Sequence, residues 1–86
     1  MNELQENLHS LLDYVAHSAP SYRFLPYIVE DINAMMDELD KSDTNSDKLK
    51  KLALGLGIFI SDDFDFSESE TGTKILDVVN SIVRSK

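Results

Sequence analysis

The chain has 86 residues and a mass of 9.7 kDa, enough for one domain with one hydrophobic core. Its sixteen Asp and Glu residues outnumber its eight Lys and Arg residues, and the resulting net charge of −8 argues against a free-standing nucleic-acid-binding protein. The absence of cysteine excludes disulfides and thiolate metal sites.

The N-terminal half predicts two amphipathic helices, over about residues 2–17 and 23–40. In the first, apolar residues recur at the spacing of one helix face, at Leu4, Leu8, Leu11, Leu12 and Val15. Pro20 ends this helix, and Pro26 is tolerated in the first turn of the next. The apolar stripe of the second helix comprises Leu25, Ile28, Val29, Ile32, Met35, Met36 and Leu39. The acidic face expected to be exposed to solvent comprises Glu30, Asp31, Asp37 and Glu38.

A third helix is predicted over about residues 47–60, after a polar loop at 40–47 that ends in an N-cap at Ser46 or Asp47. Three lysines, Lys48, Lys50 and Lys51, make the beginning of this helix basic.

The second half of the third helix is apolar on all sides. Leu54 and Ile58 lie opposite the main stripe, so this segment is either buried on both sides or a contact surface for a partner or a second copy; we expect core packing for both residues. Gly55 and Gly57 each lower helix propensity by about 1 kcal/mol, which leaves a short extended segment at 57–60 as an alternative to the helix.

A fourth helix is predicted over about residues 68–84. Ser67 and Glu70 have the spacing of a capping box, and Gly72 lies on the apolar stripe, where its lack of a side chain allows another helix to approach closely. The four segments together predict a single all-α domain, a small four-helix bundle with an orthogonal or up-down arrangement. The alternative is a helical pair that completes its core by dimerising.

No catalytic or metal-binding pattern emerges from the sequence. His9, Asp13 and His17 are spaced four apart on the first helix, but they lie opposite its leucine stripe, so we interpret them as a solvated face. EF-hand frames counted from Asp43 and Asp63 both place unsuitable residues at the glycine and last-ligand positions. We therefore expect no enzyme activity, no metal and no cofactor.

The length, acidity and helical pattern are similar, at a coarse level, to those of acyl carrier proteins and of small acidic immunity proteins that inhibit nuclease toxins. Acyl carrier proteins hold their prosthetic arm on a serine in an Asp-Ser-Leu motif, whereas the nearest string here is His9-Ser10-Leu11, inside the first helix. The paired tyrosines of the immunity proteins have no match, because four residues separate Tyr22 from Tyr27. We therefore assign no family.

The most unusual segment is an acidic stretch with two phenylalanines before the last helix. Carboxylates steer a basic partner and aromatic rings anchor it, so this segment is our candidate partner-binding site. Its residues are Asp62, Asp63, Phe64, Asp65, Phe66, Glu68 and Glu70. The alternative is that the carboxylates only cap a helix and the phenylalanines pack into the core. A second candidate surface, with core-edge packing as its alternative, comprises Tyr14, Tyr22, Tyr27 and Arg23.

The sequence therefore predicts a small, acidic, non-enzymatic protein that binds another protein, expected to be basic, as an inhibitor, immunity-type or adaptor module. The alternative function is a homodimeric regulatory or assembly subunit. The N-terminus lacks the pattern of a signal peptide and no apolar run is long enough to cross a membrane, so we expect a cytoplasmic protein that binds neither membrane nor nucleic acid.

Overall fold

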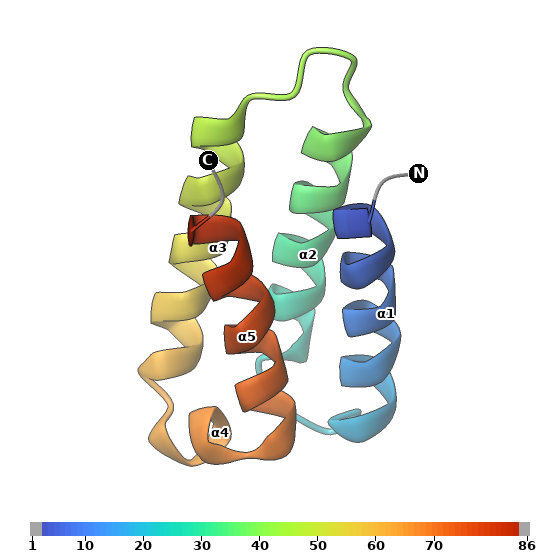
Figure 1. Cartoon of the computed structure of the whole chain (residues 1–86). Coiled ribbons are helices and arrows are strands. Elements are labelled where there is room, and N and C mark those ends of the chain that lie inside the picture. The colour runs from blue at the N-terminus through green and yellow to red at the C-terminus, as the bar shows by residue number, and fades with distance from the viewer. Residues whose placement is uncertain (1–2, 85–86) are drawn as a thin grey trace.

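Four long helices form an up-down bundle in the computed structural model, which describes residues 3–84. The helices are α1 (Glu3–Ser18), α2 (Leu25–Asp40), α3 (Ser46–Ser61), the short α4 (Phe64–Glu68) and α5 (Glu70–Arg84). Figure 1 shows α1, α2, α3 and α5 side by side with alternating directions, and α4 at the end opposite the start of α1. The all-α prediction is confirmed, and of the two predicted arrangements the up-down one is observed; residues 3–84 contain no strand.

The four predicted long helices lie within two residues of the observed ones. The extended alternative for residues 57–60 is wrong, because α3 continues to Ser61. The helical conformation places Leu56 and Ile60 on the same face, where both are fully buried. Core packing therefore overrides the low helix propensity of the two glycines.

The hydrophobic core runs along the bundle axis, and each long helix contributes at least three residues to it. Each long helix packs against two others, with α1 between α2 and α5 and α3 between α2 and α5. The buried apolar residues are Leu8, Leu11, Val15, Ile28, Ile32, Met35, Leu49, Ala53, Leu56, Ile60, Ile75, Val79 and Ile82. Met35 is thus a core residue, and Met36 packs partly buried against the core.

Glu38 contradicts the prediction of a wholly solvent-exposed acidic face on α2. Its side chain is buried, and its Oε2 atom lies 3.2 Å from the Nζ atom of Lys41. The loop after α2 folds back over this end of the helix, where the Thr44 hydroxyl donates to the Glu38 main-chain carbonyl. The Glu38 side chain is therefore buried beside the turn that follows α2, which helix periodicity does not predict.

Leu54 and Ile58 contradict the expectation of core packing. They lie on the exposed side of α3, at the edge of a groove between α3 and α5, and their exposed fractions are 52% and 57%. The predicted position opposite the main stripe was correct, but no other helix of the described chain covers that position.

Part of the acidic stretch before α5 forms the short helix α4, Phe64–Glu68. Asp63 is the N-cap of α4, because its Oδ1 atom accepts a hydrogen bond from the Phe66 main-chain N–H at 3.2 Å. The predicted capping box between Ser67 and Glu70 is wrong. Ser69 fills the N-cap role of α5 instead, and its hydroxyl accepts from the Gly72 N–H at 3.0 Å.

The N-cap of α3 also lies one residue earlier than predicted. The Asn45 side chain accepts a hydrogen bond from the Lys48 N–H at 3.1 Å, in place of Ser46 or Asp47. Asn is as good an N-cap as Asp or Ser, so composition alone does not choose among adjacent polar residues.

Gly72 allows α4 to lie directly against α5, which confirms the predicted close approach. A Cβ atom at this position would overlap the carbonyl oxygen of Phe66 and lie 2.9 Å from the Cα atom of Ser67. The contact is backbone against backbone, so no side-chain rotation relieves it. Glycine is therefore required where the two helices meet at the end of the bundle.

Candidate functional site

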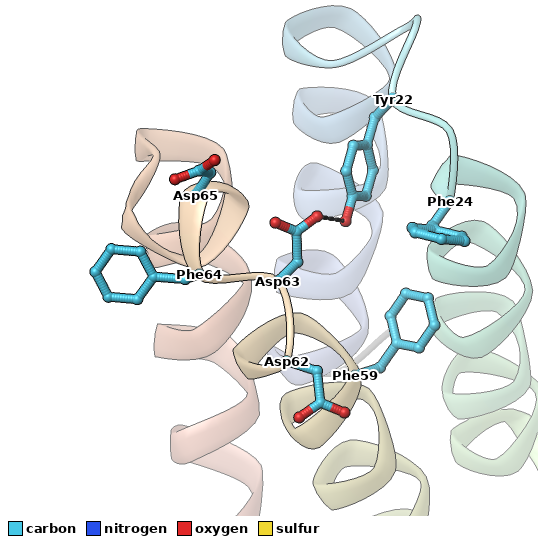
Figure 2. Close-up of a pocket in the computed structure, with 7 residues that line it drawn as sticks. All are labelled: Tyr22, Phe24, Phe59, Asp62, Asp63, Phe64 and Asp65. Atoms are coloured by element: carbon cyan, nitrogen blue, oxygen red, sulfur yellow. Dashed lines mark hydrogen bonds between the residues drawn. The ribbon is translucent and has the colours of Figure 1, made fainter.

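A pocket of about 440 Å³ opens at the end of the bundle where the chain turns from α3 into α4. Its lining residues come from the α1–α2 connection, the end of α3 and the beginning of α4 (Figure 2). We call it the acidic-aromatic pocket, and its lining residues are Tyr22, Phe24, Phe59, Asp62, Asp63, Phe64 and Asp65.

Aromatic rings from distant parts of the chain form one wall of this pocket. Phe24 and Phe59 meet edge to face with their centroids 5.4 Å apart, as Figure 2 shows. The Tyr22 ring stacks flat on Phe66, with centroids 3.9 Å apart, and Tyr27 lies 5.9 Å from Phe59. These contacts attach the α1–α2 connection to the α3–α4 corner, so the wall is held by both halves of the chain.

Asp63 uses both of its carboxylate oxygens within the chain. One caps α4, and the other accepts a hydrogen bond from the Tyr22 hydroxyl at 2.7 Å (Figure 2). Burial and this bond to Asp63 raise the pKa of the Tyr22 hydroxyl to about 12, so it remains a donor at neutral pH. Asp63 is therefore a structural residue that shapes the pocket.

Asp62 and Asp65 differ from Asp63, because neither carboxylate has a hydrogen bond or ion pair within residues 3–84. Both side chains are exposed at the rim. No basic residue lines the pocket, although the Arg23 guanidinium lies over the Phe24 ring, 5.0 Å from its centroid. A pocket with aromatic faces and uncompensated carboxylates has the chemistry to hold a cationic group.

The structure brings four of the seven predicted site residues together in the pocket, namely Asp62, Asp63, Phe64 and Asp65. The Phe64 side chain is 71% exposed, and in Figure 2 its ring points away from the Phe24–Phe59 pair. It is thus neither a core residue nor a hydrophobic staple.

The other three predicted residues do not line the pocket. Phe66 turns inward onto Tyr22, as the core-packing alternative proposed. Glu68 and Glu70 are exposed at the junction of α4 and α5, and Glu70 lies in the first turn of α5, where its charge complements the helix dipole.

The second predicted surface is divided by the fold. Tyr22 and Tyr27 belong to the aromatic contacts around the pocket, whereas Tyr14 lies elsewhere, with the Lys74 ammonium 4.4 Å from its ring centroid. Sequence reasoning missed Phe24 and Phe59 as site residues. Both are single aromatic residues at the ends of helices, a weak signal that gains meaning only when the ends meet.

The described residues offer no centre for metal chemistry. His9, Asp13 and His17 are exposed, and the His17 ring bonds to the Asp13 main-chain carbonyl at 2.8 Å. Residues 3–84 contain no group of three or more histidine or carboxylate side chains placed to hold a metal ion. No helix in that part of the chain has the length and apolar character needed to cross a membrane.

No protein-family model, no curated protein and no solved structure matches this chain.

Proposed function

We propose that this protein is a non-enzymatic binding module, an inhibitor or adaptor, that recognises a basic protein through the acidic-aromatic pocket. The observation that carries the proposal is the pocket's composition: four aromatic residues and three aspartates, with no basic residue among them. The net charge of −8 attracts a basic partner over a longer range.

The geometry suits the side chain of a Lys or Arg residue on the partner. A volume of about 440 Å³ exceeds what one such side chain needs, so part of the adjoining peptide also fits. The aliphatic stem would pack on the Phe24 and Phe59 rings, and the charged head would reach Asp62 or Asp65. The exposed Phe64 ring adds an aromatic contact at the rim.

The proposal is tested first with three short peptides that differ only at a central Arg, Lys or norleucine. Binding is followed by NMR through the amide signals of the pocket residues. We expect the Arg and Lys peptides to shift the signals of Phe59 and Asp65, and the uncharged norleucine peptide to leave them unchanged. If the norleucine peptide shifted these amide signals equally, the pocket would not recognise the positive charge, and the proposal would be wrong on that point.

Two charge reversals separate the pocket from the general acidity of the protein. Asp65→Lys changes a rim carboxylate without touching the Asp63 cap, and Asp37→Lys makes the same change at an exposed position on α2. We expect Asp65→Lys to weaken peptide binding by about tenfold, or roughly 1.4 kcal/mol, and Asp37→Lys to have a smaller effect that disappears at high salt. Equal losses would indicate nonspecific attraction.

The natural partner is sought by affinity capture from host lysate with the wild type, Asp65→Lys and Asp37→Lys proteins in parallel. We expect a basic protein that the wild type and Asp37→Lys retain and Asp65→Lys loses. A protein that all three variants retain equally would bind to a surface other than the pocket.

A further inference from the structure

The exposed side of α3 carries an apolar surface that the single chain leaves uncovered. We call it the outer α3 face and define it by Lys51, Leu54, Gly55, Ile58 and Asp62, which lie on one side of the helix at steps of three and four residues. All five are exposed. This face therefore presents a continuous helical stripe to solvent.

The centre of this face is apolar and borders a groove. A groove of about 290 Å³ runs between α3 and α5, and its lining includes Leu54, Ile58, Leu76 and Val83. Leu54, Ile58 and Val83 are three of the five large apolar residues that residues 3–84 expose. Such a cluster at a groove between two helices has the form of a helix-docking surface.

Gly55 lies on this face without a role in the fold of the single chain. A Cβ atom at Gly55 would meet no other atom within 4 Å, unlike one at Gly57, which would lie 3.0 Å from Val79. A glycine inside a helix lowers its stability, so its presence at an open position has no intramolecular explanation. It does permit a second helix to approach α3 closely.

The charges on the outer α3 face are of both signs and lie at opposite ends. Lys51 precedes the apolar centre by one turn, and Asp62 follows it by one turn. An antiparallel copy of the same helix would bring Lys51 beside Asp62 of the second copy, and a two-fold axis would repeat this pair. The same register would place Leu54 against Ile58 of the second copy.

We infer that the outer α3 face is a self-association surface, on which α3 of a second copy docks antiparallel across a two-fold axis. Charge complementarity identifies the occupant as a second copy, because in an antiparallel pair the Lys51 end of one face meets the Asp62 end of the other. The charged residues that line the acidic-aromatic pocket are all aspartates, so the pocket is not self-complementary. The two surfaces adjoin at Asp62, which lies on the outer α3 face and also lines the acidic-aromatic pocket. Leu54 does not line that pocket, so a substitution at Leu54 tests self-association separately from the proposed recognition of a basic protein.

The first test is the mass of the protein in solution, measured by light scattering from about 10 μM to 1 mM, since association depends on concentration. We expect the mass to approach twice the monomer value as the concentration rises. Leu54→Asp is expected to keep the protein monomeric throughout this range, with an unchanged helical circular dichroism spectrum. Ala16→Asp, the same charge on the exposed side of α1, is the matched control and should dimerise like the wild type.

The second test is a charge swap that reports the antiparallel register. Lys51→Asp and Asp62→Lys should each raise the dimer dissociation constant about tenfold, and the double variant should restore it, because the pair is re-formed with its signs exchanged. A protein that stays monomeric at 1 mM overturns the inference, as does a Leu54→Asp dimer as strong as the wild type. A double variant weaker than both single variants also overturns it.

Discussion

The corner where α4 meets α5 and the outer α3 face each contain a helical glycine, and the two glycines have opposite surroundings. A Cβ atom at Gly72 would lie 2.8 Å from the carbonyl carbon of Phe66, whereas a Cβ atom at Gly55 would have open space around it. The fold of one chain therefore explains the first glycine and does not explain the second. Because Gly55 lowers helix stability without allowing a close contact inside the chain, its position indicates a contact with another molecule.

Two adjacent aspartates between α3 and α4 show a similar contrast. Asp63 caps α4 and accepts from the Tyr22 hydroxyl, so its charge is used within the chain. The carboxylate of the preceding residue, Asp62, has no hydrogen bond or ion pair within residues 3–84. The connection between α3 and α4 thus contains one aspartate that holds the fold and one that is available for binding, and substitutions can separate the two roles.

Gly72→Ala should have the largest effect on stability. The added methyl group would overlap the Phe66 carbonyl, so α4 must move away from α5, and we expect the free energy of unfolding to fall by about 3 kcal/mol. The measurement is urea denaturation followed by circular dichroism. The matched control is the same substitution at Gly55, and a fall of equal size there would contradict the contrast between the two glycines.

Tyr22→Phe should have the next largest effect, because it leaves one oxygen of Asp63 without its donor. We expect a loss of about 1 to 2 kcal/mol at neutral pH, measured by urea denaturation. The pKa of Tyr22 is raised in the folded state to about 12 from 10.0, so its contribution is complete below pH 10 and is lost as the pH rises through 12.

The control for this pH dependence is Tyr27→Phe, since Tyr27 is exposed and its hydroxyl has no hydrogen bond within residues 3–84. The stability difference between wild type and Tyr22→Phe should shrink between pH 10 and pH 12. A difference that stays constant over this range would show that the Tyr22 hydroxyl does not act through its protonated form.

The long helices were predictable because each carries an apolar stripe at helical spacing, and this pattern reports burial directly. Helix α4 was not predictable in this way, because Phe64 and Phe66 are two residues apart and lie on no common helix face. What holds α4 is the Asp63 cap and the stacking of Phe66 on Tyr22, a residue from the other half of the chain. The local sequence pattern around α4 cannot predict a contact with a residue so far away in the sequence.

The candidate site was half predictable for the same reason. The acidic rim of the pocket is contiguous in sequence, so composition identifies it. Its aromatic wall is assembled from Tyr22, Phe24 and Phe59, which meet only because α1 and α2 are connected at the end where α3 gives way to α4. Glu38 is the reverse case, since it follows the polar pattern of α2 but is buried, with its carboxylate paired to Lys41 in the turn beyond the helix.

Gly55→Ala should raise stability, in contrast to the same change at Gly72. The position is helical and open, so alanine adds no clash and restricts the unfolded chain, and we expect a gain of about 0.5 to 1 kcal/mol. The unfolding free energy is measured by urea denaturation at low protein concentration, where self-association does not contribute. A loss of stability under these conditions would indicate a role for Gly55 inside the single chain.

Asp31→Asn should have the smallest effect and sharpens the distinction between charges used by the fold and charges that oppose it. Burial and the neighbouring charge of Glu30 raise the pKa of the Asp31 carboxyl above its ordinary value in the folded protein. A raised pKa means that ionisation of Asp31 opposes folding: its penalty is absent below the unfolded pKa of about 4 and complete once the pH has risen through the folded value. The amide avoids that penalty.

We therefore expect Asp31→Asn to raise the melting temperature slightly at pH 7 and to leave it unchanged at pH 3, where the wild-type carboxyl is also neutral. Glu30→Gln is the matched control, because it removes the neighbouring charge and should lower the pKa of Asp31 as followed by NMR titration. An equal gain at both pH values would assign the effect to packing of the amide, since a carboxyl that is already protonated has no ionisation penalty left to lose.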